Sequence, residues 1–320
     1  MKKITLVFCT LALSIAHLGL STMSSAQSTP EQHPALRDLQ ILSSEKMQGR
    51  APGTEGHKLA QTYLIQRLQE IGLRPCGENF IQEQSLTNPR GQTKTMQNIL
   101  ACKAGSETNL AGKNVIVLSA HYDHLGVKNG KVYHGADDNA SGVAALLEIA
   151  TQMQQQPLKH DVVLAFFDAE EQGKLGAFAY TKNTTIPLEN IGLNINLDMV
   201  ARGDKGELYA SGSHATPALK PILDSLPTTP EVKLMFGHDR PEQGQDDWTT
   251  QSDHHAFFKA GIPHLYFGVE DHVDYHQPSD QFEKVKPRFY LAAIDLIKQA
   301  TYAMDTAMLS VDLRQSRNKK

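Results

Sequence analysis

The chain has 320 residues, of which 40% are hydrophobic and 21% charged, and its formal net charge is −4 at pH 7. This length is enough for one large domain with a sizeable buried core. The mild acidity gives no electrostatic reason to expect nucleic acid or an anionic membrane surface as a partner.

The amino-terminal residues are typical of a secretory signal peptide. Two lysines follow the initial methionine, residues 4–20 are mostly apolar, and Ser-Ser-Ala at 24–26 provides the small residues of a cleavage site. No later segment approaches the ~20 consecutive apolar residues of a membrane-spanning helix. We therefore expect residues 1–26 to be a cleaved signal peptide and residues 27–320 to form one domain. The mature protein would be periplasmic or secreted, without a membrane anchor.

The cysteines are few. Cys9 would be removed with the signal peptide, so Cys76 and Cys102 would remain in an oxidising compartment. The absence of any CxxC spacing makes these sulfurs poor candidates for a zinc site. We expect a structural disulfide between Cys76 and Cys102.

The first elements of the expected domain are a helix and a hairpin. Thr54 is a suitable N-cap, apolar residues follow at helical spacing, and Gly72 can end the helix. Residues 80–86 and 95–102 have the pattern of strands, with a turn at 88–91.

From residue 114 onward the pattern alternates between strands and helices. The expected strands are residues 114–120, 161–167, 193–197 and 264–268, and the expected helices are residues 141–154, 176–181, 216–225, 252–260 and 286–304. Near-continuous apolar strands separated by helices are typical of a mostly parallel sheet that helices cover on both faces. The expected fold class is α/β, a three-layer α/β/α sandwich around a mixed, mostly parallel sheet. The polar tail at 315–320 is expected to fray.

Histidine and carboxylate residues occur repeatedly where the apolar strands end. The strand-end groups are His121 with Asp123, Asp137 with Asp138, Glu170 with Glu171, and Asp198, and His276 lies in a polar segment further on. In open α/β sheets, ligands bind at the carboxyl ends of the strands. Five loops would then bring nitrogen and oxygen ligands to one place, which predicts a two-metal hydrolytic site.

Taken singly, several of these residues have an ordinary explanation. An HxD pair is most often a feature of a surface loop, and Asp138 or Asn139 could simply cap the following helix. His124 and His134 lie near the HxD pair and could be mistaken for ligands.

The adjacent acids Glu170 and Glu171 are harder to dismiss. Successive side chains point in different directions, so one can bind a metal while the other acts as a general base. Asp168, just before them, is interpreted as structural.

The chain resembles the co-catalytic di-zinc aminopeptidases of metallopeptidase family 28. That family includes glutamate carboxypeptidase II and, with altered sites, the glutaminyl cyclases. The motifs that carry the resemblance are SAHYDHLG, GADDNASG, DAEEQGKLGA, NLDMVARG, SDHHAFFKAGIP and DYHQPSD. The resemblance covers about residues 42–285 and fills every expected metal position in order. It implies the zinc-exopeptidase fold, of the phosphorylase/hydrolase-like type, and an exported bacterial enzyme.

The resemblance also implies two zinc ions per chain. The ligands would be His121 and Asp198 for one zinc, Glu171 and His276 for the other, and Asp138 as the bridge between them. In relatives the peptide bond after the bridging aspartate is cis, so we expect the same of Asp138–Asn139.

Four further roles follow from the resemblance. Glu170 would accept a proton from a metal-bridging water that attacks the peptide carbonyl. Tyr275 would steady the oxyanion, and Asp123 would brace His121. Asp253 resembles an outer acid of the family, although it could instead cap the helix that follows it.

The implied activity is removal of the amino-terminal residue from peptides or proteins with a free N-terminus. A zinc carboxypeptidase or dipeptidase is one alternative, but relatives of the carboxypeptidase type carry large additional domains for which this chain has no room. Glutaminyl cyclase is another, and the complete two-metal set argues against it. A metal-free binding domain on the same fold is the non-enzymatic alternative.

Overall fold

A computed structural model describes residues 33–87, 91, 93–184 and 186–318 of the chain. The predicted signal peptide lies outside the described residues, as does most of the predicted turn at 88–91. The strands are β1 (Arg74–Pro75), β2 (Ile81–Thr87), β3 (Thr93–Lys103), β4 (Val115–His121), β5 (Val127–Lys128), β6 (Lys131–Val132), β7 (Val162–Phe167), β8 (Ile191–Leu197), β9 (Glu207–Ser211), β10 (Lys233–Phe236) and β11 (His264–Gly268). The α-helices are α1 (Pro34–Leu42), α2 (Glu55–Ile71), α3 (Gly142–Gln155), α4 (Leu175–Lys182), α5 (Leu219–Asp224), α6 (His254–Lys259) and α7 (Pro287–Ala307).

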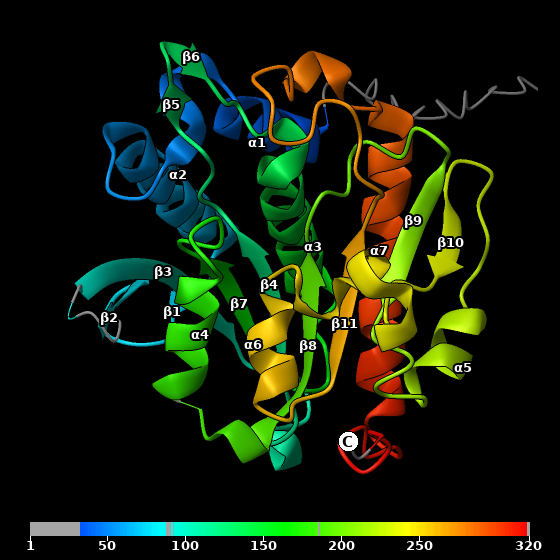
Figure 1. The fold of residues 1–320 in the computed structure, drawn as a ribbon. Coiled ribbons are helices and arrows are strands. Elements are labelled where there is room, and N and C mark those ends of the chain that lie inside the picture. The colour runs from blue at the N-terminus through cyan, green and yellow to red at the C-terminus, as the bar shows by residue number, and fades with distance from the viewer. Residues whose placement is uncertain (1–32, 88–90, 92, 185, 319–320) are drawn as a thin grey trace, which may run out of the picture.

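Within the described residues, nine strands form one mixed sheet (Figure 1). Its order is β1-β3-β7-β4-β8-β11-β9-β10, and β2 pairs with β3 outside this path. The four central strands β7, β4, β8 and β11 are mutually parallel, so their carboxyl ends lie at the same edge. Antiparallel pairs join β3 to β7 and β9 to β11 on the two sides.

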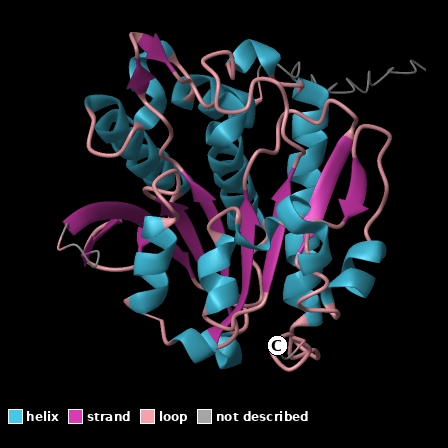
Figure 2. Cartoon of the chain, in the orientation of Figure 1, coloured by secondary structure: helices cyan, strands magenta, loops and turns pink. Residues whose placement is uncertain are grey.

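Helices cover both faces of this sheet (Figure 2). Along β4, Ile116 and Leu118 belong to the hydrophobic cluster that includes residues of α1, α2, α3 and α7. Val115 and Val117 belong to a second cluster, with residues of α4 and α6. Alternate side chains of a strand point to opposite faces, so an apolar run without interruption is buried on both sides. The α/β/α sandwich and the mixed sheet are therefore confirmed.

The local signals of the sequence also correspond to the structure. The side chain of Thr54 accepts a hydrogen bond from the backbone of His57 and caps α2. Gly72 ends this helix with φ 83°, a conformation that suits glycine. The paired strands β2 and β3 form the expected antiparallel hairpin arms.

Some elements were not anticipated from the sequence. These are α1, the short strand β1, strand β9 with the edge strand β10, and the two-stranded pair β5–β6. The expectation of a frayed tail is wrong for residues 315–318, because hydrogen bonds to other segments hold Arg317 and Asn318. The backbone of Asn318 donates to the carbonyl of Ala215 at 2.9 Å, and Arg317 donates to the carbonyl of Phe258 at 3.2 Å.

The expected disulfide between Cys76 and Cys102 is present, with 4.9 Å between the two Cα atoms. It joins the residue after β1 to β3, next to the second hydrophobic cluster. In the part of the chain that the structure describes, no helix combines the length and apolar character needed to cross a membrane.

Candidate metal centre

The predicted ligands lie at the carboxyl-terminal edge of the parallel strands. His121 is the last residue of β4, Glu170 and Glu171 follow β7, and Asp198 follows β8. Asp138 lies in a π-helical segment, Ala136–Ser141, which leads into α3. The parallel direction of these strands explains why segments far apart in sequence meet here.

Donor atoms of these residues approach one another closely around Asp138. Nε2 of His121 lies 3.3 Å from Oδ1 of Asp138 and 3.3 Å from Oδ1 of Asp198. Nε2 of His276 lies 3.1 Å from Oδ2 of Asp138 and 3.2 Å from Oε2 of Glu171. Asp138 thus presents a different oxygen to each histidine, the arrangement that a carboxylate bridge between two cations requires.

Two groups of three donors can each hold a metal ion. One consists of His121, Asp138 and Asp198, and the other of His124, Asp138 and Glu171; within each group the donor atoms all lie within 4.8 Å of one another. Neutral imidazole and carboxylate are the ligands that zinc takes in catalytic sites. Three clustered carboxylates with little access to water also need a cation nearby, so the donor set fits a metal centre.

The two adjacent glutamates have opposite electrostatic environments. Burial raises the pKa of the Glu170 carboxyl well above its usual range, and the charge of Asp253 adds to this shift. Burial and the charge of Asp138 act to raise the pKa of Glu171, but contacts with two histidines bring it below its usual range. Environments that separate the pKa values of neighbouring acids are typical of a division between proton transfer and charge stabilisation.

Asp123 contacts both glutamates as well as His121. Its carboxylate oxygens accept the backbone N–H groups of Glu170 at 2.9 Å and Glu171 at 3.4 Å. Nδ1 of His121 lies 3.6 Å from the Asp123 carboxylate and 3.2 Å from the Asp123 backbone carbonyl. Asp123 therefore positions the loop after β7 as well as the imidazole.

Asp253 is fully buried at the N-cap position of α6, yet its side chain does not cap that helix. Neither of its carboxylate oxygens has a hydrogen-bond partner among the described residues. Burial raises the pKa of Asp253 to about 8. Its electrostatic neighbours include His121 and Asp198, which supports the outer-acid role over the capping alternative.

Tyr275 stacks on His276, with 3.9 Å between the ring centroids and 23° between the ring planes. Burial raises the pKa of its hydroxyl, and the negative charge of Asp138 adds to this effect. The proton therefore stays on the hydroxyl, which keeps it a hydrogen-bond donor.

The peptide bond between Asp138 and Asn139 is cis, as expected.

Three acidic residues support the loops around the centre. Asp137 accepts the backbone N–H of Ala201 at 2.7 Å, and Asp280 accepts the N–H groups of Asp137 and Asp138. Asp168 contacts Nε2 of His57 at 2.9 Å, in agreement with its interpretation as structural.

Sequence reasoning missed Arg50, a fully buried residue beside the centre. Its guanidinium donates to four backbone carbonyls, those of Leu42, Tyr122, His134 and Gly135. An arginine at the end of a short 3-10 segment carries no sequence signal for such a role, because carbonyl acceptors are present at every residue.

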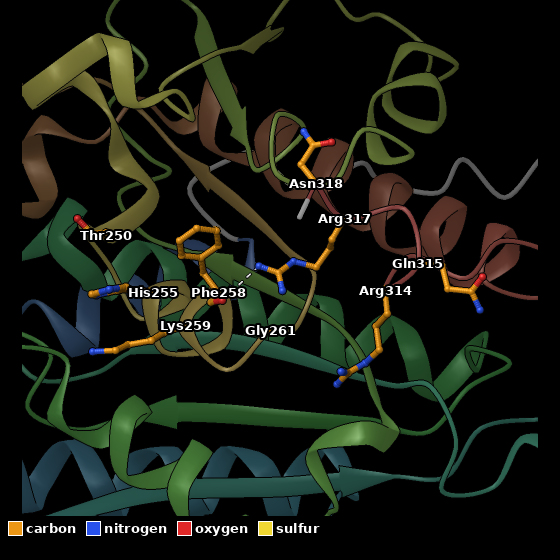
Figure 3. Close-up of a pocket in the computed structure, with 9 residues that line it drawn as sticks. All are labelled: Thr250, His255, Phe258, Lys259, Gly261, Arg314, Gln315, Arg317 and Asn318. Atoms are coloured by element: carbon orange, nitrogen blue, oxygen red, sulfur yellow. Dashed lines mark hydrogen bonds between the residues drawn. The ribbon is translucent and has the colours of Figure 1, made fainter. Parts of the chain in front are cut away.

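Two cavities of the described residues have none of the predicted site residues in their lining. One of about 950 Å³ lies between α6, the residues after it and the carboxyl-terminal tail (Figure 3). None of the predicted site residues lines it. A smaller cavity of about 240 Å³ is bordered by Val269–Val273, the segment that leads from β11 toward Tyr275. The segment that borders this cavity therefore leads directly to Tyr275 and His276.

The mixed sheet, with paired metal-binding groups at the ends of its parallel strands, is the fold of the zinc-dependent exopeptidases. The chain belongs to peptidase family M28, whose sequence profile matches residues 98–301. This range contains every predicted metal ligand.

Individual relatives agree with this assignment. Aminopeptidase YwaD of Bacillus subtilis is 30% identical over 218 residues, which make up 65% of this chain and 45% of that protein. A probable lipoprotein aminopeptidase, LpqL, of Mycobacterium tuberculosis is 31% identical over 216 residues, 63% of this chain and 40% of the relative. The chain spans about half the length of these curated relatives, or less.

Solved structures show the same fold. BSAP, a zinc aminopeptidase from Bacillus subtilis, matches with a TM-score of 0.64 at 18% identity, over 85% of this chain and 94% of that one. The glutaminyl cyclase of Tannerella forsythia matches with a TM-score of 0.63 at 22% identity, over 84% of this chain and 97% of that one. The fold alone therefore does not distinguish peptide hydrolysis from glutaminyl cyclisation.

Proposed function

We propose that the protein is a di-zinc aminopeptidase that removes the amino-terminal residue from peptides. The observation that carries this proposal is the pair of donor groups that share Asp138, since one carboxylate presents separate oxygens to His121 and His276. A single-metal site has no use for such a bridge. Family membership and similarity to proteins named aminopeptidases support the same activity.

The residues divide the chemistry among them. When bound, the zinc ions would lower the pKa of a water molecule and polarise the substrate carbonyl. Glu170 would accept a proton from the attacking water as its oxygen bonds to the carbonyl carbon. It would then deliver that proton to the leaving nitrogen as the C–N bond breaks. Burial raises the pKa of this carboxyl, which makes it a stronger base than an exposed glutamate.

Two further residues would act on the substrate or on Glu170. The hydroxyl of Tyr275 would donate a hydrogen bond to the oxyanion that forms on the carbonyl oxygen. Asp123 would hold the backbone of Glu170 so that its carboxylate faces the water. Similarity to proteins named aminopeptidases supports cleavage at the amino-terminal end of the substrate.

We also propose that the protein acts outside the cytoplasm, in the periplasm or the medium. The disulfide between Cys76 and Cys102 supports this location, because such bonds persist in oxidising compartments. The basic and apolar start of the sequence supports it independently.

A panel of amino-acid anilides tests the proposal directly. The metal-free protein should be inactive, and about two equivalents of zinc per chain should restore cleavage of anilides that carry a free amine. Anilides with an acetylated amine should not be cleaved. Full activity without metal would refute the proposed mechanism.

Glutaminyl cyclisation is the second candidate, because solved cyclases share the fold. A peptide that begins with glutamine separates the two activities. Hydrolysis releases free glutamine and a shortened peptide, whereas cyclisation keeps the peptide length and releases ammonia. We expect the shortened peptide; mass spectrometry of the products identifies which reaction occurs.

A further inference from the structure

His124 lies three residues after His121 and is held in one orientation beside the metal centre. Its side chain is buried, and its backbone N–H donates to the carbonyl of Arg50 at 3.3 Å. The ring packs against Gly135, where φ is +57° and a Cβ atom would lie 2.5 Å from Cδ2 of the imidazole. Only glycine at this position leaves room for the ring, so the imidazole has little freedom to turn elsewhere.

The Nδ1 atom of His124 faces the second donor group. It lies 2.6 Å from Oε1 of Glu171 and 3.7 Å from Oδ2 of Asp138. Despite the short distance, neither Nδ1 of His124 nor Oε1 of Glu171 has a hydrogen-bond partner with acceptable geometry in the described part of the chain. Donor atoms of His124, Glu171 and Asp138 all lie within 4.8 Å of one another, a spacing that ligands of one cation can have.

We propose that Nδ1 of His124 is a direct ligand of the metal ion held by Glu171 and His276. This inference rests on the metal centre of the proposed function. It adds a third imidazole to the two that the sequence motifs assign, and it makes the two metal positions unequal. One position has His121, Asp198 and the bridging Asp138, whereas the other has two histidines, Glu171 and the same bridge.

His124 and His276 differ in burial, and we expect them to differ in how much each contributes to zinc affinity. The side chain of His276 is 38% exposed, whereas that of His124 is inaccessible to solvent. A buried, fixed imidazole loses less freedom on binding a cation than an exposed one, so His124 should account for much of the affinity. We therefore expect the Glu171 position to bind zinc more tightly and to fill first.

Metal binding by two substituted proteins tests this role. His124→Leu removes the ligand, while His124→Asn places an amide near the position of Nδ1. Zinc affinities are measured by chelator competition on the metal-free protein. We expect His124→Leu to lower the zinc affinity of the tighter site more than ~100-fold. Loss of a residue that only contacts a ligand costs ~10–100-fold, so the effect should be larger than that. The zinc affinity of His124→Asn should lie between those of the wild type and His124→Leu. Wild-type affinity at both sites in His124→Leu would overturn the proposal.

His134→Gln is the matched control. This histidine is nearby in sequence, but its Nδ1 lies 3.0 Å from the carbonyl of Ser43, and it belongs to neither donor group. Its replacement should leave both zinc affinities unchanged. Equal losses in His134→Gln and His124→Leu would mean that the loop, and not the imidazole, causes the effect.

X-ray absorption spectroscopy of the zinc-loaded wild-type protein tests the same role without any substitution. Scattering from imidazole carbons should correspond to three histidines per two zinc ions. Two histidines per two zinc ions would overturn the proposal and leave His124 as a neighbour of Glu171. If the wild-type protein binds no zinc at all, the proposed function itself fails, an outcome that differs from both of these.

Discussion

The backbone N–H of Glu170 donates a 2.9 Å hydrogen bond to Oδ1 of Asp123 and links the loop after β7 to the loop after β4. The second oxygen of Asp123 accepts the N–H of Glu171 at 3.4 Å. The proposed general base and a proposed metal ligand are adjacent in sequence, so one buried carboxylate holds the backbone of both. In the proposed mechanism, Asp123 would couple the metal centre to the base.

This coupling predicts that Asp123→Ala impairs two properties at once. Loss of the acceptors leaves two backbone N–H groups without these partners, and the loop that carries Glu170 and Glu171 should move. We expect zinc affinity to fall ~10–100-fold, as for other outer partners of metal ligands, with a parallel loss of kcat. Asp123→Asn keeps one acceptor oxygen and should lose less of both. Wild-type zinc affinity and kcat in Asp123→Ala would contradict this role.

The two glutamates should respond differently to the same substitution. Glu170→Gln removes the proton acceptor but no principal ligand, so kcat should fall ~10²–10⁴-fold while zinc content stays at the wild-type value. Glu171→Gln weakens a ligand, so that protein should lose zinc from one position. Zinc content by mass spectrometry and anilide turnover are measured on the same samples. An active Glu170→Gln protein, or a zinc-replete Glu171→Gln protein, would reverse the assigned roles.

The strand-end residues of the centre could be predicted because the end of an apolar run indicates where a buried strand ends. His121 and Asp198 each follow such a run directly, and parallel pairing then brings them together. The orientation of a side chain is not available from such patterns. The sequence does not mark His124 as a ligand, and only the folded structure brings its ring to Glu171.

Other features depended on long-range contacts or on signals that were present but weak. Helix α1 has a proline at its first position, a cap from His33, and apolar residues three apart at Leu36 and Leu39. These signals could have identified it. By contrast, strands β9 and β10 are short and lie at one side of the sheet. The pairing of β9 with β11, and of β10 with β9, depends on the tertiary fold.

A pair far from the metal centre predicts how acid affects stability. Asp305 of α7 accepts the backbone N–H groups of Lys159 and His160 and lies 2.9 Å from Nδ1 of His160. Burial acts to raise the pKa of Asp305, but these hydrogen bonds hold it below its usual range. Because the folded-state pKa lies below the unfolded value of about 4, the stabilisation is complete above pH ~4. It is lost as the pH falls through the lower folded-state value.

Asp305→Asn should therefore cost about 2 kcal/mol of unfolding free energy at pH 6, the size of a charged hydrogen bond, and less at pH 3. Urea unfolding of both proteins at pH 6, 5 and 3 measures the difference. Both are kept metal-free with a chelator, so that loss of metal in acid does not contribute. A difference that stays constant from pH 6 to pH 3 would show that the ionised carboxylate is not responsible.

The last prediction concerns Arg50, whose guanidinium connects α1 to the loops on either side of β5 and β6. It donates to the carbonyls of Leu42, Tyr122, His134 and Gly135, at distances from 2.7 to 2.9 Å. Burial lowers the pKa of Arg50 to about 10, which leaves it charged at neutral pH. It is therefore a fixed cation beside the carboxylates of the centre, with Asp138 the foremost of them.

Removal of this side chain should destabilise the protein even without metal. Each buried carbonyl that loses its donor costs about 1–3 kcal/mol, so Arg50→Met should lose at least about 3 kcal/mol of unfolding free energy. Arg50→Lys keeps the charge, but one ammonium group cannot reach four acceptors at these positions, and it should recover only part of the loss. Arg288→Met, on the exposed side of α7, is the control and should change stability by less than about 0.5 kcal/mol. Urea unfolding of the metal-free proteins tests the order. If Arg50→Lys were as stable as the wild type, charge alone would account for the effect, and the four directed hydrogen bonds would not.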